Sequence, residues 1–307
     1  MVAMSQTPKS PVVLPSSVRL VGGGSDNEDA LAHVDITTTL AAARAYYHGA
    51  HLTSWHPAHI ADPVLWMSRH SLFRHDKPIR GGIPICFPWF GPHPTDPKLP
   101  AHGFARVSEW TLTDAHESRE GTVALTFVLS PRDSPPMPWP PFELTCQMVI
   151  GAELRLKMTV ENTGSEPFTF EEALHTYFTV ADIERISITG LESAGYLDKT
   201  QNFAKRTQAE EPIRFSGETD RTYPGTTAAC TIHDPGLGRQ IVIDKTGSHS
   251  TVVWNPWIDK ARAMPDFGDE EWRRMVCVET ANVGDDAIRL EPGASHVITV
   301  AISVRAL

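Results

Sequence analysis

Residues 142–160 read FELTCQMVIGAELRLKMTV, and this stretch decides the fold class. From Leu154 to Val160 every second residue is apolar, and the residues between them are polar. Successive side chains of a β-strand point to opposite faces, so a period of two indicates a strand with one buried face. Residues 142–150 alternate in the same way, and Gly151-Ala152 between the two runs is typical of a tight turn. The stretch therefore predicts an antiparallel hairpin.

The same alternation recurs along the chain. We expect further strands at residues 123–129, 186–188, 228–232, 240–243 and 296–304, separated by turn residues such as Asn162-Thr-Gly164. Residues 37–50 are rich in alanine, as helices often are, but their threonines and paired tyrosines favour strands. The sequence therefore predicts one mainly antiparallel all-β domain with few short helices over residues 21–307. We expect a mobile N-terminal tail over residues 1–20 and a loop over the proline-rich residues 131–141.

Charge and composition limit the possible partners. The chain has 307 residues, and its 27 lysines and arginines against 37 aspartates and glutamates give a net charge of −10. Broad nucleic-acid binding needs a basic surface, so we expect no nucleic-acid partner. Two well-placed arginines would still suffice to bind one small phosphate. The four cysteines form no metal-ligand pattern and no expected disulfide framework. The N-terminus has no uninterrupted apolar run, and no segment is long and apolar enough to span a membrane. These features predict a soluble, cytoplasmic protein.

Two segments place an arginine close to glycine. Residues 77–91 read KPIRGGIPICFPWFG, and residues 99–106 read LPAHGFAR. Glycine lets the backbone approach a ligand closely. The guanidinium groups of Arg80 and Arg106 present a planar fork of donors that matches phosphate oxygens. We therefore interpret both arginines as candidates for anion binding, although a structural salt bridge is an equally good interpretation of Arg80 taken alone.

A histidine and a glutamate stand out in two apolar segments. Residues 170–178 read FEEALHTYF, and strand alternation would put His175 on the same face as Ala173 and Tyr177. A single histidine in a strand is more often a hydrogen-bonded core residue than a catalyst. Glu279 lies in MVCVETAN (275–282), where a carboxylate is costly to bury unless it is paired or its pKa rises. Glu279 is thus either a structural ion-pair partner or a functional acid.

Six segments together resemble a known family. They are PIRGGIPICFPWFG (78–91), HGFAR (102–106), ALHTYF (173–178), GLESAGYLDK (190–199), VVWNPW (252–257) and VCVETAN (276–282). Their order resembles that of the hexose-6-phosphate mutarotases, the glucose-6-phosphate 1-epimerase family within the aldose 1-epimerase, or galactose mutarotase-like, superfamily. The resemblance covers nearly the whole chain. It implies a β-supersandwich with a cleft on its concave face, and interconversion of the α and β anomers of a hexose 6-phosphate such as glucose 6-phosphate.

The resemblance also implies roles for individual residues. His175 and Glu279 match the catalytic acid and base. The matched substrate-binding residues are Arg80 and Arg106 as a phosphate clamp, His102, Asp198 in YLDK and Trp254 in WNPW, although core packing is an equally good interpretation of Trp254. A family member can have Gln before HGxAR, where this chain has Ala101, so that amide contact is missing here. The resemblance implies an isomerase and a monomer, and we expect no cofactor, no metal and no membrane partner.

The implied chemistry makes a prediction about pKa values. Glu279 would take the proton of the C1 hydroxyl while His175 protonates the ring oxygen O5, and the opened sugar would reclose on its other face. General acid–base catalysis works best when the pKa of each group lies near the working pH. We therefore expect apolar neighbours to raise the pKa of Glu279 and the pKa of His175 to lie close to neutrality.

Several other functions remain open at this point. The protein would be a general aldose 1-epimerase if unphosphorylated sugars were turned over, or a sugar-phosphate-binding protein if no reaction occurred. A glycoside hydrolase needs two carboxylates, and Glu279 with Glu172 or Asp198 would supply them. A metal site at His51, His56 and His59 is disfavoured because their spacing matches no common ligand set.

Overall fold

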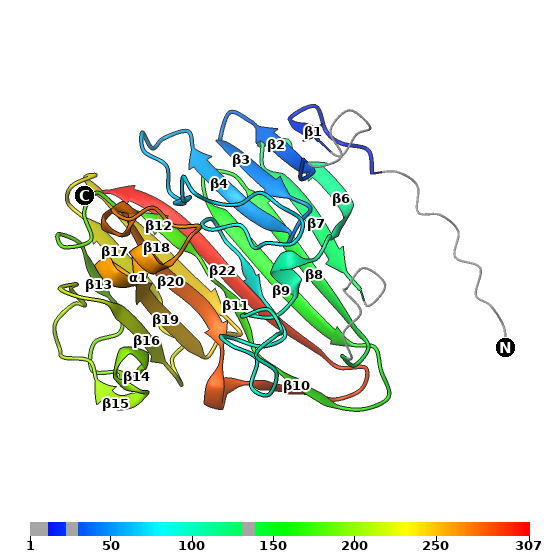
Figure 1. Cartoon of the computed structure of the whole chain (residues 1–307). Coiled ribbons are helices and arrows are strands. Elements are labelled where there is room, and N and C mark those ends of the chain that lie inside the picture. The colour runs from blue at the N-terminus through cyan, green and yellow to red at the C-terminus, as the bar shows by residue number, and fades with distance from the viewer. Residues whose placement is uncertain (1–11, 23–29, 131–138) are drawn as a thin grey trace.

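The computed structural model of the chain describes residues 12–22, 30–130 and 139–307 (Figure 1). Residues 1–11 of the predicted tail, and most of the predicted loop at 131–141, lie outside the described residues. Within the predicted tail, β1 (Val18–Val21) pairs with β2 (His33–Thr37). The sheet therefore begins a few residues before the predicted domain boundary at residue 21.

Two eight-stranded sheets dominate the described residues. We call the first the long sheet. Its strand order is β13 (Ser187–Thr189), β17 (Cys230–Asp234), β18 (Arg239–Thr246), β22 (Ser295–Ala306), β9 (Leu154–Asn162), β8 (Phe142–Ile150), β7 (Val123–Leu129) and β6 (Thr111–Glu117). The predicted hairpin is confirmed, because β8 and β9 pair antiparallel from Phe142–Asn162 to Ile150–Leu154 around the Gly151 turn. In β9 buried and solvent-facing residues alternate as the sequence predicts.

We call the second eight-stranded sheet the cleft sheet, after the cleft described below. Its strand order is β15 (Ala204–Thr207), β14 (Gly195–Asp198), β16 (Thr219–Tyr223), β19 (Ser250–Asn255), β20 (Met275–Asn282), β11 (Glu172–Leu174) and β5 (Ile85–Cys86), and β12 (Tyr177–Thr179) also pairs with β20. Every residue of β20 is buried, so neither of its faces meets bulk solvent. This strand differs from the half-buried strands that alternation predicts.

A third, four-stranded sheet consists of β1, β2, β3 (Ala41–Tyr46) and β4 (His51–Pro57). It confirms that the alanine-rich residues form strands. The sheet packs over the β6–β9 end of the long sheet (Figure 1), where Trp55 donates a hydrogen bond to the carbonyl of Gly151 at 3.0 Å. A bridge between Leu52 and Ile83 joins it to the segment that leads into β5. A small pair of strands is formed by β10 (Phe168–Phe170) and β21 (Ile288–Leu290).

Helices are short in the described part of the chain, as the sequence predicts. They are α1 (Trp257–Ala263) and the 3₁₀ turns η1 (Ala105–Val107), η2 (Lys199–Gln201), η3 (Glu271–Arg274) and η4 (Gly284–Asp286). None of the helices in the described ranges has the length and apolar character needed to cross a bilayer. Apolar side chains of the long sheet and the cleft sheet share one buried cluster, which includes Leu156 and Val276. This core holds the two sheets together by burial of apolar surface.

Candidate active site

A local opening of the cleft sheet brings His175 beside Glu279. β11 pairs with β20 up to Leu174–Thr280, and β12 resumes the pairing at Tyr177–Cys277. The two residues between these pairs leave the ladder, and the His175 amide donates instead to the carbonyl of Pro84 at 3.0 Å. Two residues separate these pairs on the β20 side as well, so His175 lies next to Glu279.

The two side chains form a buried pair. His175 Nε2 lies 3.3 Å from Glu279 Oε1, and the two side chains are only 8% and 1% exposed. His175 Nδ1 and Glu279 Oε2 have no hydrogen-bond partner among the described residues. The imidazole stacks on the ring of Tyr177, with centroids 4.8 Å apart and an interplanar angle of 10°. The stacking fixes the plane of the imidazole, while the two unpartnered atoms remain available to a ligand.

The pair lies in a cleft of about 320 Å³. All of the predicted site residues except Asp198 line it. The lining residues are Arg80, Phe90, Gly91, Pro92, Ala101, His102, Arg106, His175, Lys199, Asp220, Val252, Trp254, Lys260, Met264 and Glu279. They come from segments between residues 80 and 279, so only the folded chain assembles the cleft.

Burial shifts the pKa values of the pair in opposite directions. Loss of hydration raises the pKa of Glu279 well above its ordinary value, and nearby Asp220 adds to this. Loss of hydration also lowers the pKa of His175 well below its ordinary value, and Arg106 and Arg80 act in the same direction. The shift of Glu279 agrees with the prediction, whereas His175 does not titrate near neutrality. Both shifts favour the uncharged form of each group. The neutral pair therefore holds one titrating proton, that of the Glu279 carboxyl group, in addition to the N–H of the neutral imidazole.

Arg80 combines the two interpretations that the sequence left open. Its Nε and Nη2 donate to the two carboxylate oxygens of Asp266 at 3.1 and 3.3 Å, and its Nη1 donates to the Tyr177 hydroxyl at 3.0 Å. Burial alone would lower the pKa of the guanidinium, but Tyr177 and Asp266 hold it above its ordinary value. Arg80 is therefore a fixed positive charge that also lines the cleft.

Arg106 has fewer contacts. Its Nη2 donates to the carbonyl of Ala101 at 2.7 Å, and its Nε has no partner among the described residues. Burial lowers the pKa of this guanidinium, although an arginine stays charged at neutral pH. A buried donor without a partner costs free energy, so an anion in the cleft would stabilise this side chain.

His102 has a defined tautomer. The backbone amide of Gly91 donates to His102 Nδ1 at 3.3 Å, and burial lowers the pKa of the ring well below its ordinary value. The neutral ring therefore carries its proton on Nε2, which makes it a donor. The next residue, Gly103, has φ of +75°, and a Cβ there would lie 1.9 Å from the carbonyl oxygen of Phe87. Only glycine fits this position, which explains the HG pair of the motif.

Asp198 does not line the cleft. Its Oδ1 accepts hydrogen bonds from the amide and hydroxyl of Thr200 at 3.1 and 2.6 Å, and its Oδ2 lies 3.5 Å from Arg206 Nε. Asp198 thus caps η2, whose first residue, Lys199, does line the cleft.

Sequence reasoning missed three charged residues of the cleft. Lys199 Nζ lies 3.3 Å from Asp220 Oδ1 and 4.5 Å from the centre of the Phe90 ring, and Lys260 Nζ lies 3.9 Å from Asp220 Oδ2. Lys199 was present in the YLDK motif and could have been found there. Asp220 and Lys260 lie in ordinary polar surroundings in the sequence and give no such signal.

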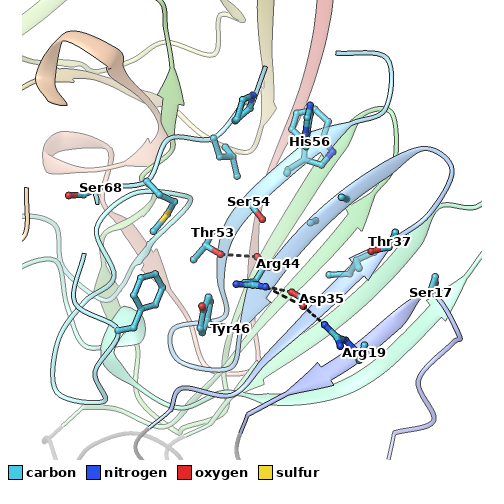
Figure 2. A pocket seen from close by; sticks show the side chains of 18 of the residues that line it. Ser17, Arg19, Asp35, Thr37, Arg44, Tyr46, Thr53, Ser54, His56 and Ser68 are labelled. Carbon is cyan, nitrogen blue, oxygen red and sulfur yellow. Dashed lines mark hydrogen bonds and ion pairs between the residues drawn. The ribbon is translucent and has the colours of Figure 1, made fainter. Parts of the chain in front are cut away.

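A larger hollow lies elsewhere. It measures about 970 Å³ and runs along the four-stranded sheet (Figure 2). Asp35 accepts hydrogen bonds from Arg44 at 2.7 Å and from Arg19 at 3.2 Å, so charged groups there pair with one another. None of the predicted site residues lines this hollow. The buried acid–base pair, rather than the size of the hollow, identifies the smaller cleft as the candidate active site.

The histidines at 51, 56 and 59 do not meet one another. The Nε2 atom of each lies at hydrogen-bond distance from a different backbone carbonyl, those of Gly81, Ile60 and Val304. Burial lowers the pKa of His51 to about 3.

Comparison with solved structures supports the predicted architecture. The crystal structure of "a putative mutarotase (YeaD)" from Salmonella typhimurium matches with a TM-score of 0.85 and 29% identity, covering 97% of each chain. A crystal structure of galactose 1-epimerase from Lactobacillus acidophilus NCFM shares the fold, with a TM-score of 0.69 and 11% identity, covering 94% of this chain and 98% of that one. The predicted galactose mutarotase-like β-supersandwich is therefore confirmed.

Comparison of sequences identifies the family. The sequence model of the family described as "Aldose 1-epimerase" matches residues 33–303. A relative from Escherichia coli (strain K12) is 38% identical over 234 residues, which are 76% of this chain and 77% of the relative. A relative from Cenchrus ciliaris is 35% identical over 270 residues, which are 85% of this chain and 80% of the relative. Both carry the name "Putative glucose-6-phosphate 1-epimerase". The chain therefore belongs to the aldose 1-epimerase family and is an isomerase.

Proposed function

We propose that the protein interconverts the α and β anomers of a hexose 6-phosphate, with glucose 6-phosphate as the first substrate to test. One observation carries the proposal: the buried His175–Glu279 pair lies in the same cleft as Arg80 and Arg106. The pair supplies proton transfer, and the arginines supply charge for a phosphate. The names of the two relatives support the same substrate.

The reaction needs one proton acceptor and one proton donor. Glu279 takes the proton of the C1 hydroxyl while His175 gives a proton to O5, and the C1–O5 bond opens to the aldehyde. After rotation about C1–C2, the two proton transfers reverse and the ring closes on its other face. The neutral pair starts with its titrating proton on Glu279, and this proton passes to His175 across their 3.3 Å contact, which lets Glu279 accept the C1 proton while His175 donates to O5. The reverse transfers restore the starting state. No electrons are transferred, so the chemistry itself requires no redox cofactor.

Different cleft residues would hold different parts of the substrate. Arg80 offers a rigid positive charge because Asp266 and Tyr177 fix it, and Arg106 offers the unpartnered Nε. His102 directs an Nε2–H donor at a sugar oxygen, and the 8% exposed Trp254 contacts an apolar sugar face. Asp198 was predicted to bind substrate directly. Its contacts favour a positioning role, in which it caps η2 and thereby holds Lys199 at the cleft.

Polarimetry of freshly dissolved α-glucose 6-phosphate and α-glucose tests the proposal. Wild type should accelerate the change in rotation of the phosphate ester above the spontaneous rate, and Glu279→Gln should not. Glu161→Gln is the matched control, because Glu161 is an exposed carboxylate on β9. Equal acceleration of both sugars would indicate a general aldose 1-epimerase. Acceleration of neither would leave a sugar-phosphate-binding protein, which calorimetry with glucose 6-phosphate would detect.

We also propose, as the sequence predicts, that the protein is a cytoplasmic monomer and that residues 21–307 are one domain. Light scattering on the eluted peak of a sizing column would test whether the protein is a monomer. A monomer has the chain mass of 33.8 kDa, and a dimer has twice that mass. One cooperative unfolding transition, seen alike by far-UV circular dichroism and tryptophan fluorescence, is expected of a single domain.

A further inference from the structure

A cluster of two histidines and a glutamate lies outside the cleft. His48, His75 and Glu109 each offer one ligand atom, and these atoms lie within 4.8 Å of one another. None of the three lines the cleft. They come from the turn after β3, from the loop before Arg80, and from the segment after η1. The three residues are far apart in the sequence, so the fold brings them together.

The contact of His48 with the backbone leaves one ring nitrogen free to bind a metal. The buried ring places Nε2 2.8 Å from the carbonyl oxygen of Lys77. A carbonyl only accepts, so Nε2 carries the proton and Nδ1 keeps its lone pair. Such a hydrogen bond to the second nitrogen is the usual support of a metal-bound histidine.

Backbone pairing fixes Glu109 relative to His48. The two residues form an isolated antiparallel bridge, flanked by hydrogen bonds from Gly49 N to Ser108 O at 2.7 Å and from Trp110 N to Tyr47 O at 2.9 Å. Two ligands are therefore held by the main chain. A carboxylate and a neutral imidazole placed in this way leave one negative charge for a cation.

His75 completes the set from an exposed loop. Its ring meets that of His48 edge-on, with centroids 6.2 Å apart. Donors around tetrahedral zinc lie about 3.3 Å apart, given bonds of about 2.0–2.1 Å. The exposed side chains of His75 and Glu109 need to move by no more than about 1.5 Å to reach that spacing.

We propose that His48, His75 and Glu109 bind one divalent transition-metal ion, with zinc as the best match. Two imidazoles and one carboxylate suit zinc, whereas Mg²⁺ and Ca²⁺ prefer oxygen ligands. The ion would leave a fourth position to water. It would also link the loop that leads to Arg80 with the segment that follows Arg106. The proposal does not depend on the proposed catalytic function.

Calorimetric titration with ZnCl₂ tests the site directly. The full chain is used without a polyhistidine tag and after removal of metal with EDTA. Wild type should bind one zinc ion, and zinc should raise its Tm by a few degrees. His75→Ala and Glu109→Gln should each weaken zinc binding by about tenfold or more, since each removes a ligand. Both positions are exposed, so both variants should fold.

His70→Ala is the matched control, because His70 is an exposed histidine on the same loop and lies outside the cluster. It should bind zinc as wild type does, and MgCl₂ should produce no comparable rise in the Tm of any of these proteins. Absence of zinc binding by wild type would overturn the proposal. Zinc binding that is equally strong in wild type, His75→Ala and Glu109→Gln would also overturn it, because the ion would then lie elsewhere.

Discussion

β9 and β20 are both inner strands of eight-stranded sheets, yet they differ in what covers them. β9 has one face in the core and one toward solvent, so buried and solvent-facing residues alternate along it. β20 is buried along its whole length, because residues of both its faces, such as Val276 and Cys277, pack in the apolar core, and only Glu279 of this strand lines the cleft. Glutamate occurs in both strands. Glu161 of β9 is exposed and hydrated, whereas Glu279 of β20 is 1% exposed and keeps one oxygen unpartnered. At Glu279 the fold therefore buries a carboxyl group away from water, and this leaves one of its oxygens available for proton transfer.

The largest expected effect comes from the buried glutamate. Glu279→Gln removes the proton acceptor, so kcat for glucose 6-phosphate should fall about 10²–10⁴-fold. Its Tm should stay near the wild-type value, because burial already favours the neutral acid, which an amide resembles. Polarimetry and thermal unfolding measure the two quantities. A variant that loses activity only because it unfolds would contradict the assignment of Glu279 as the base.

The opposite result is expected in β9. Leu156→Ala removes a fully buried side chain from the core between the sheets, so the free energy of unfolding should fall by about 2–5 kcal/mol. Below its Tm the variant should keep wild-type kcat, because Leu156 lies outside the cleft. Denaturant titration measures the loss. Lys157→Ala, on the exposed face of the same strand, should shift the Tm by less than about 2 °C.

A smaller effect is expected from one arginine of the cleft. Arg106→Ala removes charge-assisted hydrogen bonds worth about 1.5–3 kcal/mol, so KM for glucose 6-phosphate should rise about tenfold or more. Turnover of any unphosphorylated sugar should change less, since no phosphate is present. Arg155→Ala is the control, because Arg155 is an exposed arginine of β9. An unchanged KM in Arg106→Ala would remove Arg106 from the phosphate site.

The smallest effect is expected from a change of pH within the neutral range, where kcat/KM should hardly change. The active pair holds one proton. It gains a second below the lowered pKa of His175 and loses its only proton above the raised pKa of Glu279. The value of kcat/KM should therefore be flat across neutral pH and fall about tenfold per pH unit beyond either limit. The substrate phosphate ionises at about pH 6, and its contribution is subtracted. A narrow optimum at the ordinary pKa of histidine would contradict this account.

Much of the fold, and less of the site, could be predicted from sequence. The β8–β9 hairpin was predicted because alternation and a glycine turn are local signals. His175 and Glu279 stood out in apolar segments, but their catalytic roles came from a family resemblance. Their contact depends on two strands that meet β20 on either side of a gap. Asp266, which fixes Arg80, lies 186 residues away in sequence and carries no local signal. The pKa of His175 was misjudged because the covering segments, which set its burial, are also remote in sequence.

The equal gap between β11 and β12 also bears on which length changes the chain tolerates. An added residue at the turn between β6 and β7, where residues 119 and 120 are exposed, would lengthen that hairpin and leave both strands in register. An added residue between Leu174 and Tyr177 would shift one strand against β20, and a shift of one residue turns side chains to the opposite face of a sheet. His175 would then leave the cleft, or Tyr177 would no longer stack on its ring. Natural variation in length should therefore accumulate at the hairpin turns and be absent from this two-residue gap.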